Sequence, residues 1–253
     1  MAVRSTLRLV VIGVVAAATV VFTADRVKPI FLDESLVTRV DVPSATSDEK
    51  AMLLAPWSRL PFHEALATPI FLRDRSAFAV DLMGTGKVGL ARALALADVA
   101  VREAYRRRVP PALVLGVLLT ENDELKSTAR SRQGAIGLMQ IHPGPWRGAL
   151  GELFGRNLRN DTTNLRYGIY ILSHFAKRTM RREMEGSALE STLPWRTALL
   201  RYNGCVHGRN TKDCGRYPDM VRREVQRSAQ TICNGRDFEG CVVTPLRLGA
   251  RGE

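Results

Sequence analysis

One uncharged run that ends in a single carboxylate constrains this chain more than any other feature. Residues 110–120 carry no charge, and Glu121 follows them directly. A helix that is apolar all round is buried on every side. Pro110 and Pro111 suit its start, because proline is tolerated in the first turn of a helix. The sequence therefore predicts a buried central helix that ends at Glu121.

The position of Glu121 also predicts acid chemistry. A carboxyl group at the edge of an apolar surface resists ionisation, because burial disfavours its charged form and raises its pKa. Such a glutamic acid keeps its proton near neutral pH and can donate it to a substrate. A solvated charge at a helix end is the alternative that this residue alone leaves open.

Other segments show the apolar spacing of amphipathic helices. Residues 88–108 repeat apolar side chains every three or four positions and end in basic ones, as a helix C-terminus favours. Asn160 or Asp161 can cap a further helix, and residues 195–202 and 217–230 predict two more. We therefore expect a mainly α fold with functional loops between helices.

The N-terminus has the pattern of a secretory signal. Arg4 and Arg8 precede the uncharged run 9–24, and a positive flank before an apolar stretch is typical of such signals. The run is slightly short for a membrane span, which needs about 20 apolar residues. Export is expected, and both a cleaved leader and an uncleaved membrane anchor stay open.

All four cysteines lie in the last fifth of the chain. In an oxidising compartment we expect them to form disulfides, and the sequence-local pairs are Cys205–Cys214 and Cys233–Cys241, one of three possible arrangements. His207 stands between the first two, but this spacing matches no familiar zinc pattern. No metal site is predicted.

The net charge of +12 favours an anionic partner. A wall polymer, a membrane surface and nucleic acid all qualify, but aromatic residues that could stack on bases are few, so nucleic acid is not expected. The basic runs 106–108 and 177–182 are most simply solvated helix faces, and attraction to an anionic polymer is their second interpretation.

Three further segments follow Glu121 along the chain. They are SRQGAIGLMQIHP at 131–143, NLRYGIYIL at 164–172 and ALLRYNG at 198–204. Together they resemble the soluble lytic transglycosylases, bacterial enzymes that cleave peptidoglycan and share the fold of goose-type lysozyme. The resemblance covers about residues 88–230, and the GAIGLMQ core is its most specific motif.

The resemblance implies a mechanism with one acid/base, Glu121. The acid protonates the glycosidic oxygen between N-acetylmuramic acid and N-acetylglucosamine. The resulting carboxylate takes the proton of the muramic acid C6 hydroxyl, which attacks the anomeric carbon and yields a 1,6-anhydro sugar. No second carboxylate is needed, unlike in most glycosidases.

The family's sugar-binding positions fall on Asn122, Ser131, Gly134, Ala135, Met139, Gln140, Tyr202 and Asn203. The sequence departs from the family pattern in four places. Asn122 replaces the usual serine, and the stretch from Glu121 to Ser131 is one residue longer. Cys205 follows Gly204 where alanine and glycine are frequent, and Ile171 replaces a frequent tyrosine.

These inferences predict four parts: a signal or anchor at 1–24, an extension or linker at 25–86, a lysozyme-like domain with a glycan cleft at 87–230, and a tail at 231–253 with a disulfide. The resemblance implies peptidoglycan strands as partner, no cofactor, and a place in the bacterial periplasm or cell envelope.

Three other functions remain open. A lysozyme-type hydrolase would use the same acid and recruit Asp123 or Glu124 to activate water. A non-catalytic wall-binding module would keep the groove without turnover, which the Asn122 departure favours. A wall-opening factor of a secretion or conjugation machine would have the same chemistry and a protein partner.

Overall fold

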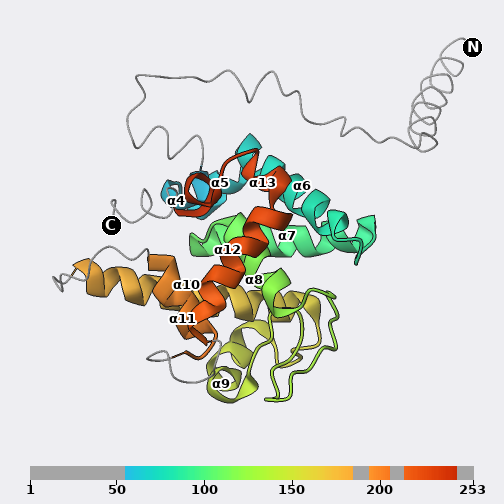
Figure 1. Cartoon of the computed structure of the whole chain (residues 1–253), viewed down its shortest axis with the longest axis vertical. Coiled ribbons are helices and arrows are strands. Elements are labelled where there is room, and N and C mark those ends of the chain that lie inside the picture. Colours follow the sequence, from blue (N-terminus) through green and yellow to red (C-terminus); the bar gives the residue numbers. More distant parts are fainter. Residues whose placement is uncertain (1–54, 185–193, 206–213, 244–253) are drawn as a thin grey trace, which may run out of the picture. The chain divides into compact units, whose positions relative to one another are not determined.

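The computed structural model describes residues 55–184, 194–205 and 214–243, and all of its regular elements are helical (Figure 1). They are α4 (Pro56–Arg59), α5 (Phe62–Leu66), α6 (Pro69–Gly84), α7 (Leu90–Arg107), α8 (Pro111–Glu121), α9 (Pro143–Phe154), α10 (Asp161–Met184), α11 (Pro194–Tyr202), α12 (Tyr217–Ser228) and α13 (Gln230–Cys233), with short turns at Cys214–Arg216 and Glu239–Val243.

Helix α8 is the buried helix that the sequence predicted. Every residue from Pro111 to Leu119 is buried, and the helix ends at Glu121. It packs against α6, α7, α12 and α13. Gly116 permits the close approach of α12, because a Cβ at this position would lie 2.4 Å from Cγ2 of Val225.

Helices α4 to α6 occupy the described part of the segment 25–86, which the sequence predicted to be an extension or a linker. Its described part belongs to the same compact unit as the rest of the described chain, and α6 packs along α7. Phe71, Phe78 and Leu82 of α6 are buried in the common core. The sequence hid this helix because Leu72 and Val80, on its outer face, are exposed apolar residues that blur the helical stripe. Residues 25–54 lie outside the described ranges.

The first part of the predicted tail is also built into the core. The carboxylate of Asp81 on α6 accepts the backbone N–H groups of Thr231 (2.9 Å) and Ile232 (3.0 Å). Phe238 is buried and packs edge-on against Trp195, with ring centroids 4.9 Å apart. The tail is therefore docked on α6 and α11 as far as Val243, where the described residues end.

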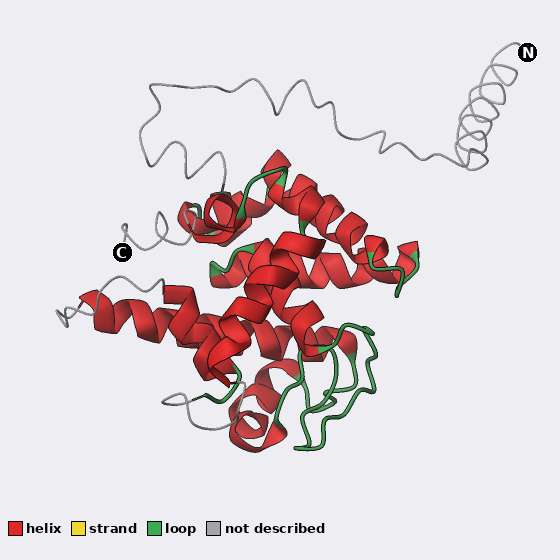
Figure 2. Cartoon of the chain, in the orientation of Figure 1, coloured by secondary structure: helices red, strands yellow, loops and turns green. Residues whose placement is uncertain are grey.

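Helix α10 begins where the sequence placed a cap. The side-chain oxygen of Asn160 accepts the N–H of Thr163 at 3.0 Å, which satisfies a backbone donor of the first turn. Leu165 and Ile169 are buried. Between α8 and α9 the chain forms a long loop (Figure 2), in which Ile136 bridges to both Arg130 and Ile141.

The predicted leader or anchor at 1–24 falls outside the described residues. Within the described ranges, none of the helices combines the length and the apolar character that a membrane crossing requires.

Candidate active site

Glu121 lies at the point where α8 meets α12. Burial raises the pKa of its carboxyl from 4.5 to about 7, and a hydrogen bond from Tyr217 partly opposes this shift. The Tyr217 hydroxyl donates to Oε1 of Glu121 at 2.5 Å. The predicted environment, a carboxyl group held at an apolar edge, is therefore present, and its acid form persists near neutral pH.

Two tyrosines stand beside this acid. The hydroxyl of Tyr202 donates to the backbone carbonyl of Met139 at 2.9 Å. Burial and the neighbouring charge of Glu121 raise the pKa of Tyr202 and of Tyr217 well above the usual value. Both phenols consequently stay protonated at neutral pH and act as hydrogen-bond donors.

A disulfide joins the two chain segments that carry these tyrosines. Cys205 and Cys214 are bonded, with Cα atoms 5.6 Å apart, and Cys233 and Cys241 form the second bridge. Both predicted pairings are confirmed. Tyr202 precedes Cys205 by three residues and Tyr217 follows Cys214 by three, so the first bridge fixes the end of α11 close to the start of α12. His207 lies outside the described residues.

Tyr217 was predicted at the start of a helix, but its contact with Glu121 could not be predicted from the sequence. The two residues are 96 positions apart, and no periodicity reports such a contact. The signal that was available is the symmetric spacing of the two tyrosines about the Cys205–Cys214 pair.

Asn122 holds the loop after the acid. Its side-chain amide donates to the carbonyls of Lys126 (2.8 Å) and Gly137 (3.2 Å), and its oxygen accepts the N–H of Lys126 at 3.2 Å. The residue is 6% exposed. Because both donors are engaged with backbone, this geometry favours a loop-positioning role for Asn122 over the predicted contact with sugar.

Asn164 of α10 anchors the GAIGLMQ loop from the other side. It accepts the N–H of Met139 at 2.7 Å and donates to the carbonyls of Ile136 (2.9 Å) and Leu158 (2.8 Å). Gly137 has φ +81°, and a Cβ there would lie 2.2 Å from Nδ2 of Asn164. Glycine is therefore required at this point of the motif.

Met139 is fully buried, in a site that Gly168 leaves open. A Cβ on Gly168 would lie 2.3 Å from Sδ of Met139. The structure thus gives no support to the prediction that the Met139 side chain lines the sugar groove. Met139 takes part in the site through its carbonyl, which receives the Tyr202 hydroxyl.

The remaining predicted positions lie at the loop surface. Ser131 and Ala135 close a tight turn, in which the Ser131 hydroxyl accepts the N–H of Ala135 at 3.0 Å and Gly134 has φ +88°. Gln140 is partly exposed and donates to the Gly137 carbonyl at 2.8 Å. Asn203 is exposed. Their contact with substrate stays a prediction.

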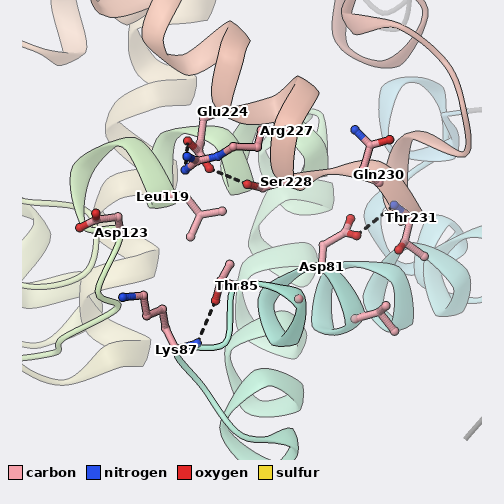
Figure 3. Close-up of a pocket in the computed structure, with 12 residues that line it drawn as sticks. Asp81, Thr85, Lys87, Leu119, Asp123, Glu224, Arg227, Ser228, Gln230 and Thr231 are labelled. Carbon is pink, nitrogen blue, oxygen red and sulfur yellow. Dashed lines mark hydrogen bonds and ion pairs between the residues drawn. The ribbon is translucent and has the colours of Figure 1, made fainter. Parts of the chain in front are cut away.

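An open hollow of about 580 Å³ lies alongside α8 and α12 (Figure 3). Lys87 and Asp123 face it from one end and Asp81 and Thr231 from the other. A second hollow, of about 510 Å³, shares four of its residues and extends to Met220, one helical turn beyond Tyr217. The shared residues are Leu119, Asp123, Glu224 and Arg227.

The two candidate second carboxylates differ in their surroundings. Glu124 is exposed and paired with Lys87 at 2.5 Å, and this charge lowers the pKa of Glu124. Asp123 is exposed and lines both hollows. Of the two, Asp123 is the one that lines the hollows. Glu121 lines neither of them, although Thr120, the residue before it, lines the second.

Residues 98–213 match the family model of the transglycosylase SLT domain. The chain carries a transglycosylase SLT domain. The family resemblance and the mainly α, lysozyme-like fold predicted from sequence are thereby confirmed. At the level of the family, the match indicates a transglycosylase-type enzyme that acts on peptidoglycan in the cell envelope. No curated protein and no solved structure matches the chain.

The matched range includes Glu121, the GAIGLMQ loop, Asn164 and Tyr202. Tyr217 lies beyond its end, at residue 213. The hydrogen-bond donor to the candidate acid is therefore supplied by a part of this chain that the family model does not span.

Proposed function

We propose that the protein is a lytic transglycosylase that cleaves the bond between N-acetylmuramic acid and N-acetylglucosamine with Glu121 as its single acid/base. The observation that carries the proposal is the place of Glu121, at the end of the buried helix α8 and in contact with Tyr217; burial there raises its pKa to about 7. A group with a pKa near the working pH can both give and take a proton, and this reaction requires both steps from one residue.

The hydrogen bond from Tyr217 gives the two carboxyl oxygens of Glu121 different roles. Oε1 accepts the tyrosine hydroxyl, so the transferable proton of the acid sits on Oε2. The acid gives this proton to the glycosidic oxygen as the bond to the muramic acid anomeric carbon breaks. Tyr217 then stabilises the new carboxylate, because a hydrogen bond to a charged acceptor is stronger than one to a neutral acceptor.

The second step restores the acid. The Glu121 carboxylate takes the proton of the muramic acid C6 hydroxyl, and the C6 oxygen bonds to the anomeric carbon. One carbon–oxygen bond breaks, one forms, and the proton balance at Glu121 closes. Water is not consumed, so the product is the 1,6-anhydro sugar.

The two hollows beside α8 support a glycan cleft. Each is within the range of about 300–1,000 Å³ that is usual for ligand sites, and each carries both charged and neutral polar side chains. Sugar hydroxyl groups need such donors and acceptors. Thr120, the residue before Glu121, lines the second hollow, so we place the sugar chain along α12, past Met220, with its scissile bond beside this hollow at Glu121.

We also propose that the enzyme acts in the periplasm. Export through residues 1–24, as leader or as anchor, would bring the domain to its substrate in the periplasm. The disulfide pairs Cys205–Cys214 and Cys233–Cys241 support an oxidising compartment. A protein partner in a wall-spanning machine would be found by co-purification from cell envelopes.

Digestion of purified peptidoglycan, followed by mass spectrometry of the sugar ends, tests the reaction. We expect anhydro-muramic ends from the protein and from its Glu124→Gln variant, and none from Glu121→Gln. Products heavier by one water would identify a hydrolase, and Asp123→Asn would then be the variant that abolishes them. Binding to peptidoglycan without products from any variant would identify a wall-binding module.

A further inference from the structure

A third cavity, of about 540 Å³, lies where the end of α7 meets α10. It is lined by Arg107, Tyr170, Ser173, His174, Lys177 and Arg178. From the sequence alone, the two basic runs 106–108 and 177–182 are most simply solvated helix faces. The fold instead brings Arg107 from the first run and Lys177 and Arg178 from the second to one cavity.

The positive charge around this cavity exceeds the negative charge available to balance it. Glu103 is a buried carboxylate that three guanidinium groups share, those of Arg106 (3.8 Å), Arg107 (3.8 Å) and Arg166 (3.5 Å). None of the six described residues that line the cavity is acidic. Lys177 and Arg178, which are both exposed, line the cavity beside this cluster.

Arg107 has donors to spare. Its Nε is buried without a hydrogen-bond partner among the described residues, and its contact with Glu103 is too long for a hydrogen bond. This nitrogen faces Oε2 of Glu103, which is also buried without a partner among the described residues. A ligand in the cavity would therefore accept hydrogen bonds from the terminal amino groups of the Arg107 guanidinium group.

The walls of the cavity are held in place by aromatic contacts. The guanidinium carbon of Arg107 lies 4.8 Å from the ring centroid of Tyr170. His174 stacks on Tyr170 at 6.4 Å and meets Trp146 edge-on at 5.7 Å. The hydroxyl of Ser173 donates to the Arg107 carbonyl at 3.2 Å. Because these cations are already held in position, ordering them when a ligand binds costs less free energy.

We propose that this cavity binds the phosphate group of an anionic ligand. The fork of an arginine matches two phosphate oxygens, and charge-assisted bonds of this kind are strong. Lys177 and Arg178 supply further charge. The cavity is larger than a phosphate ion, so it has room for an attached glycerol or sugar. A soluble phosphorylated molecule and a lipid headgroup offer the same group, and Glu121 takes no part in this binding.

Calorimetric titration of the full-length protein with glycerol 3-phosphate tests the site, together with co-sedimentation on vesicles of phosphatidylglycerol or of phosphatidylcholine. The test variant is Lys177→Gln with Arg178→Gln, which leaves the Arg107–Glu103 contact in place. The control is Arg132→Gln with Arg159→Gln, which removes the same charge from exposed residues outside the cavity. Unchanged thermal unfolding establishes that both variants fold.

We expect the test variant to weaken binding by about tenfold or more, as the loss of charged hydrogen bonds implies, while the control stays close to the unaltered protein. A loss with glycerol 3-phosphate identifies a site for soluble phosphates. A loss confined to phosphatidylglycerol vesicles identifies a headgroup site at a membrane surface. Equal behaviour of the test and control variants in both assays overturns the proposal.

Discussion

Replacing Glu121 with glutamine should stabilise the fold at alkaline pH and leave it nearly unchanged at acid pH. Burial raises the pKa of Glu121 from 4.5 to about 7 in the folded protein. Between these values the folded state holds a proton that the unfolded state has lost, so the free energy of unfolding falls as pH rises from 4.5 to 7. Above pH 7 the full cost of a buried charge is present. Glutamine carries no charge, and its side-chain oxygen can still accept the Tyr217 hydroxyl.

The magnitude follows from the two pKa values. Each pH unit of difference corresponds to about 1.4 kcal/mol, so the span from 4.5 to about 7 amounts to about 3 kcal/mol. The side chain is partly exposed, so this figure is an upper value. The difference in unfolding free energy between Glu121→Gln and the unaltered protein should grow by about this amount from about pH 4 to about pH 8.

Urea unfolding followed by tryptophan fluorescence measures this difference, since the other titrating groups are common to both proteins and cancel. Glu124→Gln is the control, because Glu124 is exposed and its pKa is lowered by Lys87, which gives a change of opposite sign. A Glu121→Gln difference that stays constant within about 0.5 kcal/mol from acid to alkaline pH would refute the claim that burial keeps Glu121 protonated.

Three further perturbations test the site and its support. Tyr217→Phe removes the hydrogen bond that lowers the Glu121 pKa, so the alkaline limb of the pH–rate profile should move to higher pH while the rate falls; an unmoved limb would contradict this contact. Gly116→Ala should cost about 1–3 kcal/mol by overpacking, since its Cβ would meet Val225, and Val225→Ala in the same chain should restore part of the loss in urea unfolding. Asn164→Ala removes three hydrogen bonds to the loop; peptidoglycan cleavage should drop more than tenfold with about 1–3 kcal/mol of stability, and full activity in the variant would show that the loop does not need this anchor.

Features that depend on residues close together in the chain could be predicted from the sequence. The uncharged run 110–120 fixed α8 and its terminal acid, because a helix without a polar face has to be buried. Asn160 marked the start of α10 through a local hydrogen bond. Cys205–Cys214 and Cys233–Cys241 paired with their nearest partners, as short loops in the chain favour.

Features that depend on how helices pack across one another could not be predicted from the sequence. Tyr217 reaches Glu121 only because α12 packs along α8 at Gly116. The membership of α6 in the core was hidden, since its stripe is blurred by exposed apolar residues. The packing of Met139 against Gly168 could not be predicted either, because Gly168 lies on another helix.

The sequence by itself thus predicted which residue is the candidate acid, where α8 ends and α10 begins, and which family the chain resembles, because these rest on local pattern and order along the chain. The tertiary structure alone decided which groups surround that acid and which cations share the cavity at Arg107 and Lys177. The reason is physical: the pKa of a carboxyl and the charge balance of a cavity depend on distances between distant segments, and only packing sets those distances.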